Sequence, residues 1–426
     1  MRSLLKDRNA RWYLGGQSFS LFGDVALWLA MGIWVKELTG SSGEAGLVFF
    51  FFGLAAVLSP VAGLVVDRVA RRPLLIVANL AGCGTVLLLL GVHGRSQVWL
   101  IFAVAFGYGW VYTFLSAGQS ALLAEMLPDA LLPDANGLLR TVREALRLVG
   151  PIVGAGLFAV AGGGVVAVVD AATFAIAAGS LLFVRVDGRR APPAEEHLLA
   201  EVTAGIRHLW RTTVLRQMVV AISITMLVVG FFESIAFSVV TVGLHRSPTF
   251  LGVVLAAQGA GALVGGPSSA PLVRRWKEGP LIGVGLVVLA AGTGLTAEPT
   301  LETVLGGAVL LGLSLPWIIV GAVTLLQRRT PANLQGRVSS AADTLLSVPQ
   351  TISIGVGAGL VSVVDYRLLL GAVAVVVIVS ALYLLTRKEQ WLEWSPEPGA
   401  SEPGRDGEAA VLDPAERIGR VGAPEH

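Results

Sequence analysis

The chain has 426 residues, of which 54% are hydrophobic and only 14% charged, and its mean hydropathy is +0.74. A soluble fold of this length cannot bury that much apolar surface, because a single core stops growing at roughly 250–300 residues. The composition therefore excludes a soluble enzyme and a nucleic-acid-binding protein. The net charge is only +2, and the single cysteine, Cys83, permits no disulfide within the chain.

Apolar stretches follow one another along the chain, separated by short charged or Gly/Pro-rich joints. A spanning helix needs about 20 apolar residues, so about twelve spans fit into this length. The pattern predicts an all-α membrane protein with twelve transmembrane helices. They are expected near 12–36, 44–66, 73–93, 98–125, 138–160, 164–184, 215–243, 249–272, 279–297, 301–326, 337–361 and 367–386.

Lysine and arginine are distributed unevenly between the two sets of joints. The N-terminal segment and the even-numbered joints are rich in arginine, whereas the opposite set holds only Lys36, Arg95, Arg246 and Arg367. Short cytoplasmic loops of membrane proteins carry an excess of these residues. We therefore expect both termini in the cytoplasm. The first apolar stretch is too long for a cleavable signal peptide.

The longest joint, 185–214, lies between the sixth and seventh predicted spans. Its apolar residues recur at helical spacing, with Glu, His and Arg between them, which predicts an amphipathic helix on the cytoplasmic membrane surface. A plain solvated linker is the alternative. From Glu389 onward Pro, Glu, Gly, Arg and Asp dominate, which predicts a disordered cytoplasmic tail.

The two sets of six spans resemble each other in sequence. A shift of 203 residues places Gly154 on Gly357 and also Arg71 on Arg274. One offset that joins separate regions predicts two six-helix halves in the same orientation, an architecture typical of transporters with a substrate site between the halves. The expected boundaries are 1–186 and 214–388 for the halves, 187–213 for the linker and 389–426 for the tail.

Residues 63–72, Gly-Leu-Val-Val-Asp-Arg-Val-Ala-Arg-Arg, resemble the signature loop between helices 2 and 3 of the major facilitator superfamily. The stretches 20–24, 121–128, 150–154 and 170–174 resemble its branch of enterobactin-type exporters and macrolide efflux pumps. The chain departs from the family patterns at Ala70 and Ala155, where glycine is usual. The resemblance implies a monomeric transporter in a bacterial cytoplasmic membrane, with a small-molecule substrate, protons as the coupling ion and no cofactor.

The same resemblance implies a conformational gate on the cytoplasmic face. Asp67 would lie against the positive N-terminus of helix 11, near Arg337, and Arg71 would bridge to Glu125. Ordinary positive-inside charge is the alternative, and it explains the arginines but not Asp67. The remaining members of the predicted gate are Gly63, Arg68 and Arg72.

Two carboxylates stand within apolar spans. A charge at bilayer depth costs roughly 2.5–3.5 kcal/mol on insertion scales, so such residues are functional candidates. Asp24 in helix 1 could bind a proton or a cationic substrate group, or could serve helix packing. Glu233 in helix 7 could hold a proton near neutral pH, or could be a neutral, hydrogen-bonded glutamate. Helices 1 and 7 are repeat-mates and both line the cavity in the resembled family.

Helix 5 carries a charge cluster in which Glu144 can reach Arg140 and Arg147 at helical spacing. Arg147 could face the cavity and attract an anionic group. The alternative is a cluster at the cytoplasmic end that pairs with Asp343. For Asp170 in helix 6 we expect a structural hydrogen-bonding role.

The motif Gly150, Pro151 and Gly154 removes a backbone donor and allows close helix contact, so helix 5 is expected to bend or rock there. In helix 4, Tyr108 or Tyr112 could stack on a substrate. Plain packing is the alternative for these aromatic residues.

No histidine or cysteine pattern has metal-ligand spacing, and no phosphate-binding loop of the G-x-x-x-x-G-K type occurs, which excludes an ATP-driven pump within this chain. The sequence predicts a secondary-active, proton-coupled exporter of a small amphipathic compound, such as a drug, an antibiotic or a siderophore-like product. A nutrient importer is the first alternative, and the cavity helices look too apolar for it. A lipid-handling protein or a non-transporting sensor is the alternative from another class.

Overall fold

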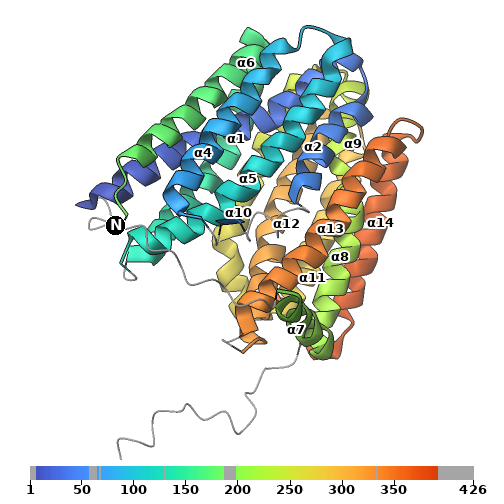
Figure 1. Cartoon of the computed structure of the whole chain (residues 1–426). Coiled ribbons are helices and arrows are strands. Elements are labelled where there is room, and N and C mark those ends of the chain that lie inside the picture. Colours follow the sequence, from blue (N-terminus) through green and yellow to red (C-terminus); the bar gives the residue numbers. More distant parts are fainter. Residues whose placement is uncertain are drawn as a thin grey trace, which may run out of the picture. The chain divides into compact units, whose positions relative to one another are not determined.

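The computed structural model describes residues 6–56, 65–66, 69–128, 131–186, 198–331 and 334–391, and every regular element in those ranges is a helix (Figure 1). The residues of the predicted gate loop at 63–64 and 67–68, part of the linker and the tail from 392 lie outside the described residues.

The helices follow the predicted spans in order. The first set comprises α1 (Arg8–Thr39), α2 (Ser42–Ala56), α4 (Arg71–Leu87), α5 (Val98–Met126) and α6 (Leu132–Leu182). The second set comprises α8 (Thr213–Val229), α9 (Phe232–Ser238), α10 (Leu251–Trp276), α11 (Glu278–Thr296), α12 (Leu301–Arg328), α13 (Gln335–Leu360) and α14 (Tyr366–Leu385). Within the described ranges, nine segments are long and apolar enough to cross a membrane. The other predicted spans correspond to α2, to one arm of α6 and to α13.

Two predicted spans run together as α6 and are separated by a single glycine. Gly162 has φ 76° and ψ 172°, which breaks the helix into a first arm, 132–161, and a second arm, 163–182. A side chain rarely adopts such a backbone conformation, whereas glycine adopts it readily. The predicted seventh span is interrupted too. It is built from α8 and α9, with a break at Gly230–Phe231, and it ends in a π-helical turn at Val239–Gly243.

Helix α1 packs along both arms of α6, and Figure 1 shows the two helices side by side. The contact is close because small residues meet the facing backbone. A Cβ atom added to Gly154 would lie 2.7 Å from the carbonyl oxygen of Ala26, and one added to Gly23 would lie 3.2 Å from Cα of Asp170. Small residues that let helix backbones approach are typical of membrane interfaces. The close contact predicted for the Gly150–Gly154 motif is therefore present.

The second set is organised around other pairs: α11 packs against α12 and α14, and α8 packs against α13 and α14. The linker contains the expected amphipathic helix, α7 (Leu198–Arg211), which packs on α8 and α13 through the fully buried Leu209. The first residues of the predicted disordered tail are instead ordered. Gln390 ends a helical turn, is buried, and donates to the carbonyl oxygen of Val214 at 3.0 Å.

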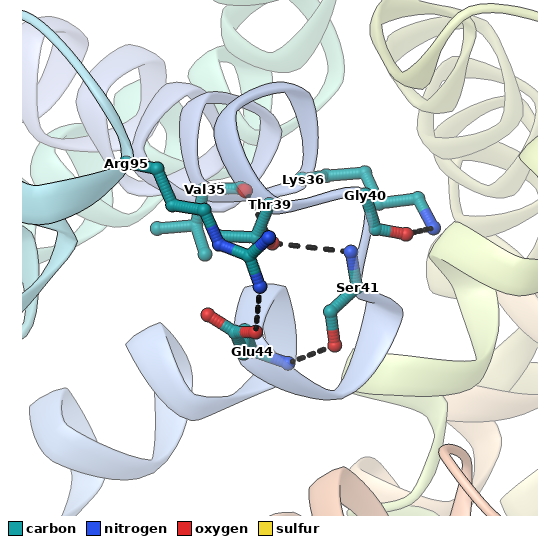
Figure 2. A network of polar contacts seen from close by, with 7 residues as sticks. All are labelled: Val35, Lys36, Thr39, Gly40, Ser41, Glu44 and Arg95. Carbon is teal, nitrogen blue, oxygen red and sulfur yellow. Dashed lines mark hydrogen bonds and ion pairs between the residues drawn. The ribbon is translucent and has the colours of Figure 1, made fainter.

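The end of the bundle where α1 ends and α2 begins is called the distal end, and the opposite end the proximal end. Figure 2 shows the polar network that fixes this distal turn. Gly40 has φ 72°, and Lys36 Nζ donates to its carbonyl oxygen at 2.8 Å. The Ser41 hydroxyl accepts from the backbone N–H of Glu44 at 3.1 Å. The Glu44 carboxylate lies 3.9 Å from the Arg95 guanidinium, an exposed pair that adds at most about 1 kcal/mol.

This turn places the start of α2 against the second set of helices. A Cβ atom on Gly43 would overlap the carbonyl oxygen of Ala358 in α13, and one on Gly46 would overlap the Ser234 hydroxyl in α9. We call these contacts the distal seam. In α10, Gly252 similarly lies against Pro151 of α6. Among the described residues, contacts between the two sets extend from the distal end as far as Gly53 of α2, which lies against Thr351 of α13.

Gly43→Val should prevent the distal seam from closing, because the added side chain meets backbone that cannot move aside. We expect a longer distance between spin labels at Ser96 and Ser362, both exposed at the distal end, in pulsed electron resonance measurements. Gly359→Ala is the control, since a Cβ there meets nothing within 4 Å. An unchanged distance distribution in Gly43→Val would show that the seam tolerates a side chain.

Candidate functional site

A pocket lies in the proximal half of the first set of helices, between α1, α5 and the first arm of α6. Its lining is mostly polar: Gln17, Leu21 and Asp24 from α1, Tyr112, Leu115, Ser116 and Gln119 from α5, and Arg143 from α6. This pocket is more polar than the apolar sequence of its helices suggests. Averaged over a whole span, hydropathy hides a polar stripe that occupies one face.

Asp24 lies partly exposed in this pocket, and a hydrogen bond from α5 holds its side chain in place. The Tyr108 hydroxyl donates a hydrogen bond to Asp24 Oδ1. Tyr108 itself is buried, with its ring 5.9 Å from that of Phe52 and 5.7 Å from that of Phe174. Tyr108 therefore orients Asp24 and offers no face to a substrate. Tyr112, which is 40% exposed and lines the pocket, retains that possibility.

The positive charge of the pocket comes from Arg143. Its guanidinium is near enough to act electrostatically on Asp24 and on the Tyr13 hydroxyl. The sequence of the helix 5 cluster favoured Glu144 and Arg147, because charge spacing along one helix does not show which member faces another helix. The structure does not describe the side chains of Glu144 and Arg147.

Asp170 is a neighbour of Asp24 and belongs to the second arm of α6. It is only 1% exposed, and its Oδ1 atom lies against the backbone of Gly23, the residue before Asp24. The two carboxylates are close enough for their charges to interact. The Thr173 hydroxyl donates to the backbone carbonyl oxygen of Asp170 at 2.7 Å and lies 3.3 Å from Asp170 Oδ1. None of the described residues makes a hydrogen bond to Oδ2.

Glu233 occupies a different place. It stands in the first turn of α9, beside Ser234 of the distal seam, and does not line the pocket. The two carboxylates selected from the sequence, Asp24 and Glu233, are thus not brought into one pocket. The acidic partner that the fold gives Asp24 is Asp170.

The predicted gate residues that the structure describes lie at the proximal end. Arg71 Nη1 lies 3.3 Å from Glu125 Oε2, so the expected ion pair is present. It joins α4 to α5 and therefore does not by itself connect the two sets. Arg72 donates to the carbonyl oxygens of Leu181 and Leu182, both at 2.9 Å, which places its charge at the negative end of α6. In α13, the carbonyl oxygen of Arg337 lies against Gly205 of α7.

Metal binding finds no support in the described part of the chain, where no group of three or more His, Cys, Asp or Glu side chains could hold an ion. What the pocket offers is one carboxylate, one guanidinium, two amides and an aromatic face. The enclosed space is large enough for about one water molecule, so the pocket marks a polar face between α1, α5 and α6.

Known proteins resemble this chain in sequence over both sets of helices. A family model described as Major Facilitator Superfamily matches residues 13–243 and 222–414. Over 348 residues the chain is 22% identical to a macrolide efflux protein A of Streptococcus pyogenes, covering 80% of this chain and 86% of that protein. It is 27% identical over 371 residues to the multidrug efflux pump Tap of Mycolicibacterium fortuitum, covering 80% and 88%.

Among solved structures, a bacterial homologue of the iron transporter ferroportin in an inward-facing state matches with a TM-score of 0.68 and 15% identity, covering 88% of this chain and 97% of that one. At this identity the likeness concerns the fold alone. Since the family model spans both sets of helices, the chain belongs to the major facilitator superfamily and is a multi-pass membrane transporter.

Proposed function

We propose that the protein is a secondary-active exporter that moves a small amphipathic organic molecule out of a bacterial cytoplasm in exchange for protons. The observation that carries the proposal is Asp24: an ionisable group, partly exposed in a polar pocket between transmembrane helices and oriented by Tyr108. The names of the macrolide and multidrug efflux relatives support export as the direction and a drug-like molecule as the substrate.

The predicted orientation supports the same proposal. If the arginine-rich proximal end faces the cytoplasm, the pocket lies on the cytoplasmic side of the distal seam. Substrate would then bind from the cytoplasm, and the seam would have to open for release. Each proton that re-enters down the membrane potential supplies about 2.3 kcal/mol per 100 mV, which can drive the return step.

A nutrient importer on the same fold is the second candidate. The polar lining of the pocket, with Gln17, Gln119 and Arg143 beside Asp24, favours an importer. The apolar sequence of the helices disfavoured one. The direction of transport separates the two. In proteoliposomes of known orientation, an exporter accumulates a labelled macrolide on the side of the distal seam when a proton gradient is imposed, whereas an importer does not.

Asp24→Asn should abolish efflux driven by a pH gradient but leave downhill exchange of a labelled macrolide intact, because an amide mimics a protonated acid and cannot release the proton. Glu233→Gln should behave in the same way if Glu233 also carries coupling. The measurement is efflux from proteoliposomes with and without an imposed gradient. Glu302→Gln is the control, since Glu302 is exposed in the first turn of α12. Full, pH-responsive activity in both mutants would remove Asp24 and Glu233 from the mechanism.

Asp67→Asn tests the gate. We expect a protein that inserts and folds normally but transports more slowly. In the arrangement that the family resemblance implies, the closed cytoplasmic face would lose an anion at a helix N-terminus, worth about 0.3–2 kcal/mol. Turnover in proteoliposomes, compared with the amount of correctly inserted protein, measures the effect. If Asp67→Asn turned over at the wild-type rate, Asp67 would have no gating role.

A further inference from the structure

We infer that one side of α7 binds the phosphate headgroups of anionic phospholipids, and that this contact holds α7 against the proximal ends of α12 and α13. The side consists of Ile206, Arg207, Trp210 and Arg211, all of them exposed, and we call it the outer face of α7. The sequence predicts a helix at the membrane surface, but neither the headgroup nor the residues that select it. The outer face is independent of the substrate and of the direction of transport.

The opposite side of α7 is fixed to the protein. Leu209 is fully buried, and a Cβ atom on Gly205 would overlap the carbonyl oxygen of Arg337 in α13. His208 Nε2 donates to the carbonyl oxygen of Arg329, the residue that follows α12, at 3.0 Å. These contacts determine how α7 is rotated about its axis, so the residues on its other side point away from the bundle.

The protein covers only part of the apolar surface of α7. Ile206 is 38% and Trp210 is 46% exposed, although both belong to the same apolar pattern as the buried Leu209. Arg207 and Arg211 directly follow these two residues and are exposed as well. Positions three and four residues apart lie on one side of a helix, so two apolar and two basic side chains stand together there. This mixture is typical of helices that lie in the headgroup region of a membrane.

Tryptophans at the proximal end mark the membrane surface independently of α7. Trp12 near the start of α1, Trp276 at the end of α10 and Trp391 after α14 are all exposed. Tryptophan is enriched where a membrane meets water, because its ring is apolar and its N–H group is polar. Figure 1 shows α7 at this same end, beside the proximal ends of α8 and α13. Trp210 therefore joins these residues at the level of the lipid headgroups.

The basic residues of the outer face can bind phosphate. Arg216, at the start of α8, donates to the carbonyl oxygen of Trp210 at 3.3 Å, so a third exposed guanidinium lies close to Arg207 and Arg211. A guanidinium presents paired donors that match the oxygens of a phosphate group, and it loses its water more readily than an ammonium does. Arginine is therefore well suited to a headgroup phosphate.

Two acidic residues of the second set stand at the proximal end but do not cancel this charge. Glu278 is buried and lies 2.6 Å from the guanidinium of Arg328. Glu389 directly follows two basic residues, Arg387 and Lys388. The outer face thus favours a headgroup with a net negative charge. Phosphatidylglycerol keeps the charge of its phosphate, whereas the choline group of phosphatidylcholine compensates it.

Binding of lipid to the full-length protein in detergent, counted by native mass spectrometry, tests the outer face without transport. Phosphatidylglycerol should bind more tightly than phosphatidylcholine with the same acyl chains. In Arg207→Gln/Arg211→Gln, the affinity for phosphatidylglycerol should fall about fivefold for each arginine removed. The matched control is Arg95→Gln/Arg246→Gln, which removes two exposed arginines at the distal end and should bind as the wild type does.

The apolar half of the outer face separates a lipid from a water-soluble anion. Ile206→Gln/Trp210→Gln keeps both arginines, and it should bind phosphatidylglycerol more weakly because the acyl-chain boundary loses its contacts. Glycerol phosphate, which carries the phosphate without acyl chains, should not displace the lipid from the wild type. Unchanged lipid binding in Ile206→Gln/Trp210→Gln, or displacement by glycerol phosphate, would overturn a lipid as the occupant.

Hydrogen exchange provides the second measurement. Backbone amides of α7 should exchange more slowly in nanodiscs of phosphatidylglycerol than in nanodiscs of phosphatidylcholine, because a ligand of the folded helix suppresses its local opening. The difference should vanish in Arg207→Gln/Arg211→Gln. Equal exchange in the two lipids, or wild-type binding of phosphatidylglycerol in this variant, would overturn the inference.

The chain's own tail is the competing occupant, because acidic residues outnumber basic ones beyond Trp391. Glu402→Gln/Glu408→Gln in the full-length protein tests it. If the lipid occupies the outer face, this variant should prefer phosphatidylglycerol as the wild type does. A preference that appears only in this variant would show that the tail covers the outer face in the wild type, and it would overturn the inference.

Discussion

The close approach of α1 to both arms of α6 is the contact on which the candidate site depends. Small residues make it possible: Gly23 meets Asp170, and Gly154 meets the backbone of Ala26. In lipid, helices gain little from hydrophobic burial against each other, so van der Waals contact between closely approaching backbones holds them together. A side chain at Gly23 would separate the helices and, with them, the two carboxylates. The same packing that stabilises the first six helices thereby builds the polar site.

The two ends of the bundle are built differently, and alternating access requires such a difference. At the distal end, small residues of α2 lie against α9 and α13, and the network around Lys36 and Gly40 holds the turn that positions them. At the proximal end, the Arg71–Glu125 pair and the contacts of Arg72 remain within the first set of helices. Movement between the sets can therefore leave these proximal contacts intact while the distal seam breaks.

Charges within the membrane are costly, so their arrangement indicates what the molecule does with them. Asp24 has a hydrogen-bond donor in Tyr108 and a counter-charge in Arg143, whereas Asp170 has one weak donor in Thr173. A purely structural carboxylate would be expected to have both oxygens satisfied. Among the described side chains of α6, Asp170 is the one with a buried oxygen that has no hydrogen-bond partner.

Hydropathy, the distribution of arginine and the offset of 203 residues allowed the sequence by itself to predict a membrane protein with twelve spans in two halves, because these properties are local or repeat along the chain. The family came from the resemblance of residues 63–72 and of four other stretches to known motifs. The motif of Gly150 and Gly154 likewise predicted a close helix contact, and Arg71 with Glu125 an ion pair. The sequence selected Glu233 as the counterpart of Asp24, and Arg147 rather than Arg143. Only the tertiary structure decided that Asp170, Tyr108 and Arg143 surround Asp24, because the rotation and depth of each helix depend on the side chains of its neighbours.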